Sequence, residues 1–257
     1  MKGETGKPPS LKNYKLTVEY DGTEFRGWQI QKQNERTVQG ELEKVCARIF
    51  QHKANVIGSG RTDSGAHALG QVAHFKAQTK LSPQEIQKAF NALLPEDIVI
   101  HAVRAVDSTF HAQLSATGKT YRYTILNRPY RTAQTRRTSY FYPYKLNVAA
   151  MRREARDLIG CRDFRSFQAS DSLREDKSTV RRVKAVRLRR AKDCIYFEIT
   201  ANGFLYKMVR NIVGTLLEVG NGRLPPGSIQ RILRLKNRTK AGATAPAHGL
   251  CLMKVDY

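Results

Sequence analysis

Cysteine is scarce in this 257-residue chain, and its four cysteines lie far apart. They are Cys46, Cys161, Cys194 and Cys251, and no two of them form a Cys-x-x-Cys pair. A zinc ribbon and a disulfide-stabilised secreted fold both need cysteines at short, regular spacings, so the sequence argues against both. The spacing is typical of a protein of the reducing cytosol, and we expect a cytoplasmic location.

Long apolar runs are absent as well. No stretch reaches the roughly 18 apolar residues that a membrane-spanning helix requires. The first lysines are not followed by the apolar segment of a secretory signal. We therefore expect no membrane partner. Hydrophobic residues still make up 40% of the chain, which is enough for real cores, so the high charge does not indicate disorder.

Acidic residues are few: 22 Asp and Glu stand against 45 Lys and Arg, which gives a formal net charge of +23. Residues 108–153 hold nine basic and no acidic side chains, interleaved with tyrosines and phenylalanines. Residues 177–192 hold eight more basic side chains and again no acid. Because cations bind phosphates and aromatic rings stack on unpaired bases, this pattern predicts an RNA-binding surface. The alternative is a strand pair with its tyrosines in a core and its arginines in water.

Hydrophobic periodicity and turn signals predict an α+β fold. In the first part we expect strands at 14–20, 71–76, 98–106 and 120–126, a helix capped by Thr37, and a helix opened by a capping box at Ser82 and Glu85. In the second part we expect a helix from Asn147 to Gly160, a hairpin of 180–190 with 195–201, a central helix at 204–219, a short helix from about 228 and a strand at 250–257. The order indicates two similar α+β halves, which we place at 14–112 and 113–257 behind a flexible tail of residues 1–13.

The densest glycine cluster is the loop of residues 58–67, Gly-Ser-Gly-Arg-Thr-Asp-Ser-Gly-Ala-His. It is not a dinucleotide-binding fingerprint, because Asp63 stands where a glycine is needed, and it is not a P-loop, because no Lys-Ser or Lys-Thr follows Gly65. The motifs of a nucleobase deaminase do not occur in the chain. What remains is a tight loop that presents Asp63 close to Arg61. An ionised aspartate can act as a nucleophile or base, whereas capping the turn is its commoner use, and both interpretations stay open here.

The segment GSGRTDSGAHALGQVAHF resembles the signature of the TruA family of tRNA pseudouridine synthases. Further segments resemble family motifs in the same order along the chain, from about Tyr14 to Tyr257. They are YDGT at 20–23, GWQ at 27–29, TVQG at 37–40, ALLP at 92–95, FHA at 110–112, KTY at 119–121, NGFLYKMVRN at 202–211 and AGATAP at 241–246. The resemblance implies the pseudouridine synthase fold, with two ferredoxin-like or RRM-like α+β halves whose antiparallel or mixed sheets are flanked by helices.

The same resemblance implies the activity and the partners. Members of the family isomerise uridine to pseudouridine at positions 38, 39 and 40 of the tRNA anticodon arm. They break the N-glycosidic bond, turn the base and rejoin it to the ribose through carbon. The family uses no cofactor and no metal and is homodimeric, so we expect tRNA and a second copy of the chain as the partners.

The resemblance also assigns residues. Asp63 matches the catalytic aspartate, and Arg61 matches the arginine that fills the space left by the flipped nucleotide. Tyr121 matches the tyrosine that stacks on the target base, Arg210 the basic residue that pairs with the catalytic carboxylate, and Leu250 an aliphatic residue of the pocket. Phe110, His111 and Lys119 are further expected substrate-binding residues. By position alone, Tyr121 could equally be a core aromatic, and Arg210 a solvated helix charge.

Three features depart from the family pattern, and one of them is Ala66 in place of the family's usual valine. Gln113 stands where the family usually carries arginine, and Lys119 or Arg122 would have to compensate. The acidic residues at 171, 175 and 176 have no physical explanation on so basic a surface. A rival interpretation is a non-catalytic RNA-binding or RNA-chaperone protein on the same scaffold, and a third is a structural RNA partner of the ribosomal type.

Overall fold

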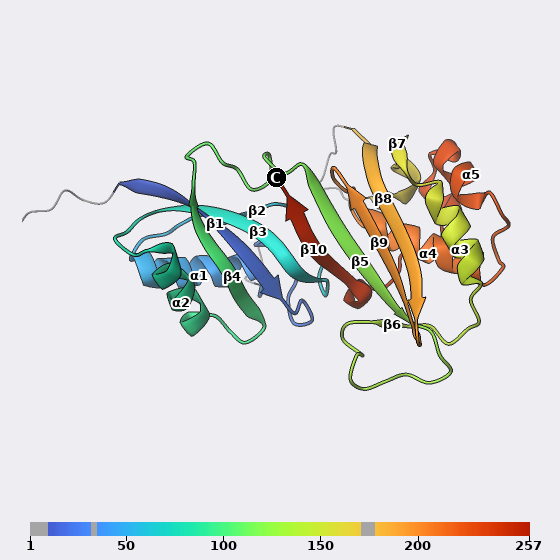
Figure 1. The fold of residues 1–257 in the computed structure, drawn as a ribbon, viewed down its shortest axis with the longest axis horizontal. Helices are drawn as coiled ribbons and strands as arrows, with labels where there is room; N and C mark the ends of the chain where they lie inside the picture. Colours follow the sequence, from blue (N-terminus) through green and yellow to red (C-terminus); the bar gives the residue numbers. More distant parts are fainter. Residues whose placement is uncertain (1–9, 32–34, 171–177) are drawn as a thin grey trace, which may run out of the picture. The chain divides into compact units, whose positions relative to one another are not determined.

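The computed structural model describes residues 10–31, 35–170 and 178–257 (Figure 1). The acidic residues at 171, 175 and 176, and positions 1–9 of the expected tail, lie outside the described residues. The chain forms two compact units, which we call unit 1 (Met1–Ser64 with Ala68–Ala116) and unit 2 (Gly65–His67 with Thr117–Tyr257). The domain boundary at residues 112/113 stays a prediction, because compactness does not show that either part folds alone. Within the described ranges, no helix is long and apolar enough to cross a membrane.

Unit 1 is an antiparallel sheet with two crossover helices. Its elements are β1 (Leu11–Tyr20), α1 (Val38–Phe50), β2 (Ile57–Gly58), β3 (His67–Gln78), α2 (Pro83–Leu93) and β4 (Ile98–Val106). The strands lie in the order β4-β1-β3-β2, with every neighbouring pair antiparallel. This β-α-β-β-α-β succession is the ferredoxin-like arrangement.

Aromatic rings form the centre of the core of unit 1. Phe50 of α1 and Phe90 of α2 both contact Phe75 of β3, with ring centroids 5.4 and 5.8 Å apart. Phe75 also stacks on Tyr14 of β1 at 5.5 Å. Because both helices reach the same ring, α1 and α2 cover the same face of the sheet, the face from which Tyr14 also points inward.

The helices of unit 1 begin where local sequence signals place them. The Thr37 side chain accepts the N–H of Gly40 at the start of α1, and Ser82 and Glu85 form the predicted capping box at the start of α2. Strand β1 is longer than expected: it begins at Leu11, so three residues assigned to the tail pair with the end of β3.

Unit 2 repeats the same succession. Its elements are β5 (Gly118–Leu126), β6 (Tyr140–Phe141), α3 (Val148–Arg156), β7 (Gly160–Asp163), β8 (Val180–Ala191), β9 (Cys194–Ala201), α4 (Met208–Gly220), α5 (Ser228–Leu235) and β10 (Leu250–Asp256). The strands lie in the order β10-β5-β9-β8-β7 and are antiparallel, and the short β6 pairs with β5 in parallel. Each unit therefore contains a β-α-β-β-α-β core with the same strand order, which confirms the prediction of two similar ferredoxin-like α+β halves.

Helix α4 is the central helix of unit 2, as its apolar sequence predicts, and most of its residues are buried. It begins at Met208, four residues later than expected, because Lys207 adopts a left-handed backbone conformation (φ 56°) that a helix cannot continue. Helix α3 is capped by Asn147 as predicted. It ends at Arg156, earlier than expected, because Gly160 already begins strand β7.

Candidate active site

The first half of the loop that carries Asp63 is fastened to strand β3. The Ser59 N–H donates to the carbonyl oxygen of Val72 at 2.7 Å, and the Ser59 hydroxyl donates to Gln71 Oε1 at 2.7 Å. Gln71 Nε2 in turn donates to the carbonyl oxygen of Gly60 at 3.0 Å. Ser59 and Gln71 are fully buried. These bonds fix the backbone of the loop before it reaches Asp63.

The middle of the loop is held by Trp28 and Tyr20. The backbone N–H of Trp28 donates to the carbonyl oxygen of Thr62 at 3.2 Å, and the hydroxyls of Tyr20 and Thr62 lie 2.8 Å apart. The Trp28 indole also lies over Gly58, where a Cβ would come within 2.6 Å of three ring atoms. Only glycine leaves room for the indole there, so one tryptophan supports the loop at both Gly58 and Thr62.

Gly27 lies against the loop backbone at the position of Asp63. Its φ is +92°, and a Cβ there would lie 2.7 Å from the carbonyl oxygen of Thr62 and 3.3 Å from the amide nitrogen of Ser64. Asp63 itself is half-buried and Arg61 is exposed. The loop therefore presents a carboxylate from a fixed backbone and leaves the arginine beside it accessible to solvent.

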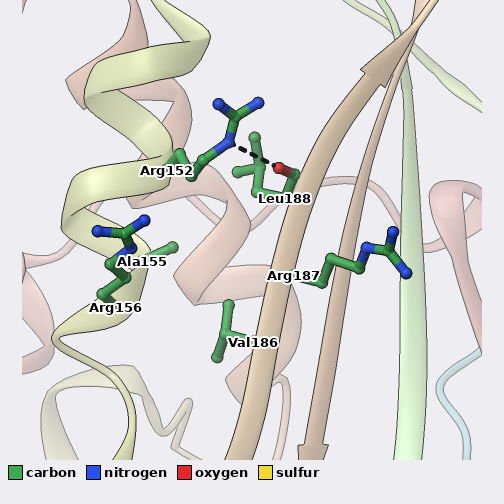
Figure 2. A pocket seen from close by; sticks show the side chains of 6 residues that line it. All are labelled: Arg152, Ala155, Arg156, Val186, Arg187 and Leu188. Carbon is green, nitrogen blue, oxygen red and sulfur yellow. Dashed lines mark hydrogen bonds between the residues drawn. The ribbon is translucent and has the colours of Figure 1, made fainter.

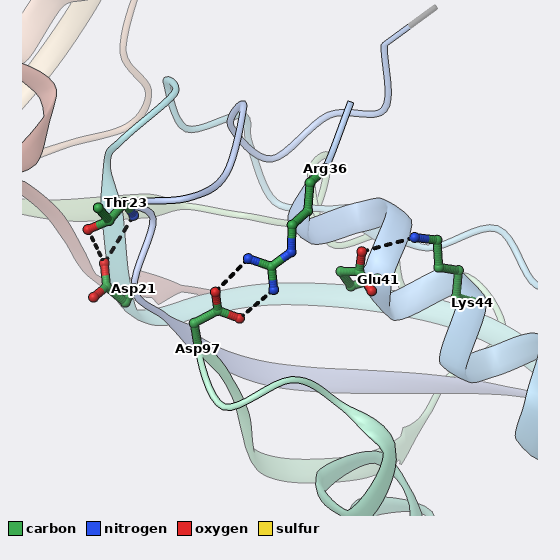
Figure 3. Close-up of polar contacts among 6 residues, drawn as sticks. All are labelled: Asp21, Thr23, Arg36, Glu41, Lys44 and Asp97. Atoms are coloured by element: carbon green, nitrogen blue, oxygen red, sulfur yellow. Dashed lines mark hydrogen bonds and ion pairs between the residues drawn. The ribbon is translucent and has the colours of Figure 1, made fainter. Parts of the chain in front are cut away.

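A bidentate ion pair fixes the segment that precedes α1. The Arg36 guanidinium donates two bonds to the Asp97 carboxylate, at 2.7 and 2.8 Å (Figure 3), and lies 4.2 Å over the ring of Phe25. The carbonyl oxygen of Asp97 also accepts the N–H of Asp21, whose carboxylate accepts the N–H and the hydroxyl of Thr23 (Figure 3). Because bidentate arginine–carboxylate pairs are geometrically specific, this segment is tied to the start of β4 in one arrangement.

Phe110 and His111 lie on another loop of unit 1, against His74 of β3. His74 Nδ1 accepts the N–H of Ala112 at 3.1 Å, and its ring lies 4.8 Å from that of His111 and 6.0 Å from that of Phe110. Burial lowers the pKa of His74, and the neighbouring His111 lowers it further. The accepted hydrogen bond needs the neutral ring that the lowered pKa favours. His74 also pairs with Ile57 of β2, so it supports the base of the glycine-rich loop as well.

Tyr121 and Leu250 lie on the neighbouring strands β5 and β10 of unit 2. The register pairs Leu250 with Tyr123 and Leu252 with Tyr121. Since directly opposed residues point to the same face, Tyr121 and Leu250 share one face of the sheet. Both are buried, and the ring of Tyr121 packs edge-on against Phe204 at 5.0 Å and 87°. This contact fixes the plane of the tyrosine ring.

Arg210, in the first turn of α4, clamps the segment that precedes β10. Its Nε donates to the carbonyl oxygen of Ala245 at 2.7 Å, and its own carbonyl oxygen accepts the N–H of Ala245 at 3.2 Å. The Tyr123 hydroxyl donates to the adjacent carbonyl oxygen of Pro246 at 2.8 Å. Burial raises the pKa of Tyr123, and the nearby Arg210 charge offsets part of that rise. Arg210 is half-buried and is not a fully solvated surface charge.

The last residue of the loop is fixed within unit 2. His67 is buried, and its Nε2 lies 2.7 Å from the carbonyl oxygen of Arg137 and 3.2 Å from that of His248. Because carbonyl oxygens only accept hydrogen bonds, Nε2 carries the proton in these contacts. The chain is thus anchored on both sides of Asp63: at residues 59–62 within unit 1 and at His67 within unit 2.

Lys119 lies on β5 two residues before Tyr121 and on the same face. Burial lowers its pKa to about 8, so part of the amine is neutral in slightly alkaline solution. Gln113, the departure from the family pattern, is exposed. Of the two cations that could compensate for it, Arg122 is already paired with Glu198, at 2.8 Å from Nε and 2.7 Å from Nη2.

Sequence reasoning assigned no role to the residues that hold these pieces in place. Asn211 is one example: its Nδ2 donates to the carbonyl oxygen of Phe167, and its Oδ1 accepts from Arg238 and Thr244. Gln71 is another. Their signal in the sequence is an uncharged polar side chain within an apolar helix or strand. Because buried polar groups are nearly always hydrogen-bonded, such a residue marks a fixed junction.

Known proteins resemble this chain over nearly its whole length. A family model described as tRNA pseudouridine synthase matches residues 16–114 and 155–257. The tRNA pseudouridine synthase A of Thermoanaerobacter sp. strain X514 is 45% identical over 247 residues, which cover 96% of this chain and 100% of that protein. The chain belongs to the tRNA pseudouridine synthase family.

Other relatives in the family are equally similar. The tRNA pseudouridine synthase A of Clostridium acetobutylicum is 45% identical over 247 residues, covering 96% of this chain and 100% of the relative. The tRNA pseudouridine synthase A of Limosilactobacillus reuteri strain DSM 20016 is 45% identical over 249 residues, which cover 95% of this chain and 96% of that protein. A chain of a solved Cbf5–Nop10–Gar1 complex aligns with a TM-score of 0.33 and 12% identity. The alignment covers 97% of this chain and 59% of that chain, and the similarity is too weak to inform the fold. The predicted family, a family of RNA-modifying isomerases, is confirmed.

Proposed function

We propose that this chain isomerises uridine to pseudouridine at positions 38, 39 and 40 of the tRNA anticodon arm, with Asp63 as the catalytic residue. The observation that carries the proposal is the anchored loop. Trp28, Gly27 and Gln71 hold its backbone around one half-buried carboxylate. A catalytic group must be held close to its productive geometry by such supporting contacts. Family membership over nearly the full length supplies the reaction class.

The reaction itself needs only groups that a protein can supply. The bond between N1 and C1′ of uridine breaks while Asp63 acts on the nucleotide, the base turns, and C5 forms the new bond to C1′. C5 loses its hydrogen as a proton and N1 gains a proton, so no electron enters or leaves the substrate. The proposal therefore includes no cofactor and no metal.

Unit 2 supplies side chains suited to a flipped base. Extracting a uridine from its stack costs a few kcal/mol, and stacking on an aromatic ring returns about 1–3 kcal/mol. Tyr121, whose ring plane Phe204 fixes, is the proposed platform, and Leu250 on the same face is the proposed apolar wall. Arg210 is proposed to keep the catalytic carboxylate ionised, because an adjacent cation favours the charged form.

The remaining site residues are proposed to hold the RNA. They are Arg61, at the place of the flipped nucleotide, and Phe110, His111 and Lys119. The proposal further includes a homodimer in the cytoplasm, which rests on the family resemblance and, for the location, on the cysteine spacing. The mass of the purified protein in solution tests the dimer.

Asp63→Asn tests the catalytic assignment, because it removes the charge and keeps the shape. With tRNA labelled with tritium at C5 of uridine, the wild type is expected to release tritium and the variant to lose at least 99% of that activity while still binding tRNA. Asp157→Asn, the same change on a half-buried residue of unit 2, is the matched control and should keep full activity.

Two results would contradict the proposal. Full turnover by Asp63→Asn would remove its catalytic role. Binding of tRNA by the wild type without any tritium release would favour the RNA-chaperone or structural RNA-binding interpretation instead. Base-resolved mapping of pseudouridine in the product tests the anticodon-arm positions directly.

A further inference from the structure

Unit 2 contains a pocket that the proposed reaction does not use. It lies between helix α3 and strand β8 and has a volume of about 260 Å³. Its lining residues are Arg152, Ala155, Arg156, Val186, Arg187 and Leu188 (Figure 2). The volume lies below the roughly 300–1,000 Å³ of sites for drug-sized ligands. The lining contains arginine and apolar side chains and no acidic one, so the pocket suits a small anionic group.

Arg152 is held in position by the strand. Its Nε donates to the carbonyl oxygen of Leu188 at 3.0 Å (Figure 2). This bond uses one of the five N–H donors of the guanidinium group. Within the described ranges its terminal Nη atoms make no hydrogen bond, so four donors on an oriented group remain for a ligand.

Arg156 lies one helical turn after Arg152. Like charges at this spacing destabilise a helix, and a bound anion relieves the repulsion. In the part of the chain that the structure describes, the Arg156 side chain has no ion-pair partner. Glu154, between the two on the helix, cannot neutralise them, because its carboxylate accepts the N–H groups of Gly227 and Ile229 at 2.6 and 2.9 Å.

The rest of the lining is apolar. Ala155 and Leu188 are buried and Val186 is half-buried. In Figure 2 the guanidinium of Arg187 points away from α3, so the charge in the pocket comes from the helix. Arg152 and Arg156 are exposed, so they can attract an anion from solution, and the apolar wall borders the anion on its other side. The pocket therefore combines charge for a phosphate with a surface for the carbon atoms next to it.

We propose that this pocket binds a backbone phosphate of RNA, with Arg152 and Arg156 as donors and Val186 and Leu188 against the adjoining ribose. The proposal rests on the proposed function, because that function brings tRNA to this protein. Strand β8 is two strands from β5, or about 10 Å, so the pocket is a contact separate from Tyr121. Phosphate contacts of this kind fix the register of the RNA and select no base.

The test compares Arg156→Gln with Arg153→Gln. Arg153 is an exposed arginine of the same helix, does not line the pocket, and has no ion-pair partner among the described residues. The affinity for tRNA is measured at several salt concentrations. Losing one phosphate contact should reduce the slope of log K against log salt by about 0.7–0.9 for Arg156→Gln and by clearly less for Arg153→Gln. The double variant Arg152→Gln/Arg156→Gln should lose about the same amount, because both arginines bind the same phosphate.

A second measurement identifies the source of the phosphate. Inorganic phosphate is titrated into the protein while the NMR signal of the Arg152 Nε–H is followed. Equal salt slopes for Arg156→Gln and Arg153→Gln, in variants with the wild-type melting temperature, would overturn the proposal. A shift with inorganic phosphate but without any change in slope would also overturn the assignment to RNA. Tritium release by the wild type is measured separately, so failure of the pocket is distinct from failure of the proposed function.

Discussion

Gly27 shows how one absent side chain positions the candidate catalytic residue. The loop backbone around Asp63 runs so close to Gly27 that a Cβ would lie 2.7 Å from the carbonyl oxygen of Thr62, and the φ of +92° disfavours every other residue. The sequence marks Gly27 only as part of a motif. Its reason, close contact between two loops far apart in sequence, is visible only in the folded chain.

Gly27→Ala is expected to weaken both folding and catalysis. Overpacking of this kind lowers the free energy of unfolding by about 1–3 kcal/mol. A displacement of about 1 Å at a reacting group can reduce turnover on the order of a hundredfold. Urea denaturation and tritium release measure the two effects. Gly203→Ala is the control for stability, because its Cβ would meet only Arg181, at 3.6 Å; wild-type turnover by Gly27→Ala would show that the contact does not position Asp63.

Helix α5 shows the limit of local signals at the level of an element. The helices α1, α2 and α3 are capped by Thr37, Ser82 and Asn147, each within three residues of the group it binds, and sequence reasoning predicted all three. Gly227 precedes α5 and offers no side-chain cap. The cap comes from Glu154 of α3, 75 residues before the amide of Ile229 that it binds. No pattern within α5 could reveal this partner.

Glu154→Ala is therefore expected to destabilise the chain strongly for a single polar substitution. It leaves two amide groups at the start of α5 without their buried acceptor, and an unsatisfied buried donor costs about 1–3 kcal/mol. The helix dipole adds to the loss, because a carboxylate is stabilised at a helix N-terminus. The free energy of unfolding in urea measures the change. Glu96→Ala, the same substitution at an exposed position, should stay within about 0.5 kcal/mol of wild type, and an equally small effect at Glu154 would contradict the capping role.

At the scale of the whole molecule, the net charge of +23 predicts that tRNA binding weakens steeply as salt increases. Arg61, exposed on the loop that carries Asp63, is expected to contribute one of the contacts. Arg61→Gln should reduce the slope of log K against log salt by about 0.7–0.9. Lys53→Gln, an exposed cation in the same unit, is the matched control and should change the slope much less. If both variants gave the same slope, the placement of Arg61 at the RNA would be wrong.

The sequence by itself determined the α+β class, the two similar halves, the starts of three helices and the family. These depend on patterns that recur within a few residues, such as apolar spacing and capping, or on motifs that keep their order along the chain. It also singled out Asp63 as a candidate, because glycines within three residues of it mark a tight loop.

Only the tertiary structure decided which side chains support that aspartate and which arginines share a pocket. Trp28 meets Gly58, Gln71 meets Gly60, and Arg152 meets Leu188 across separations that no local pattern encodes. Each contact forms because the packing of a buried sheet fixes two distant segments at once, and the buried polar groups must then find partners there. The charge of the chain is a property of its composition, but a phosphate pocket requires two arginines on one side of α3 to face an apolar strand, and folding alone brings them there.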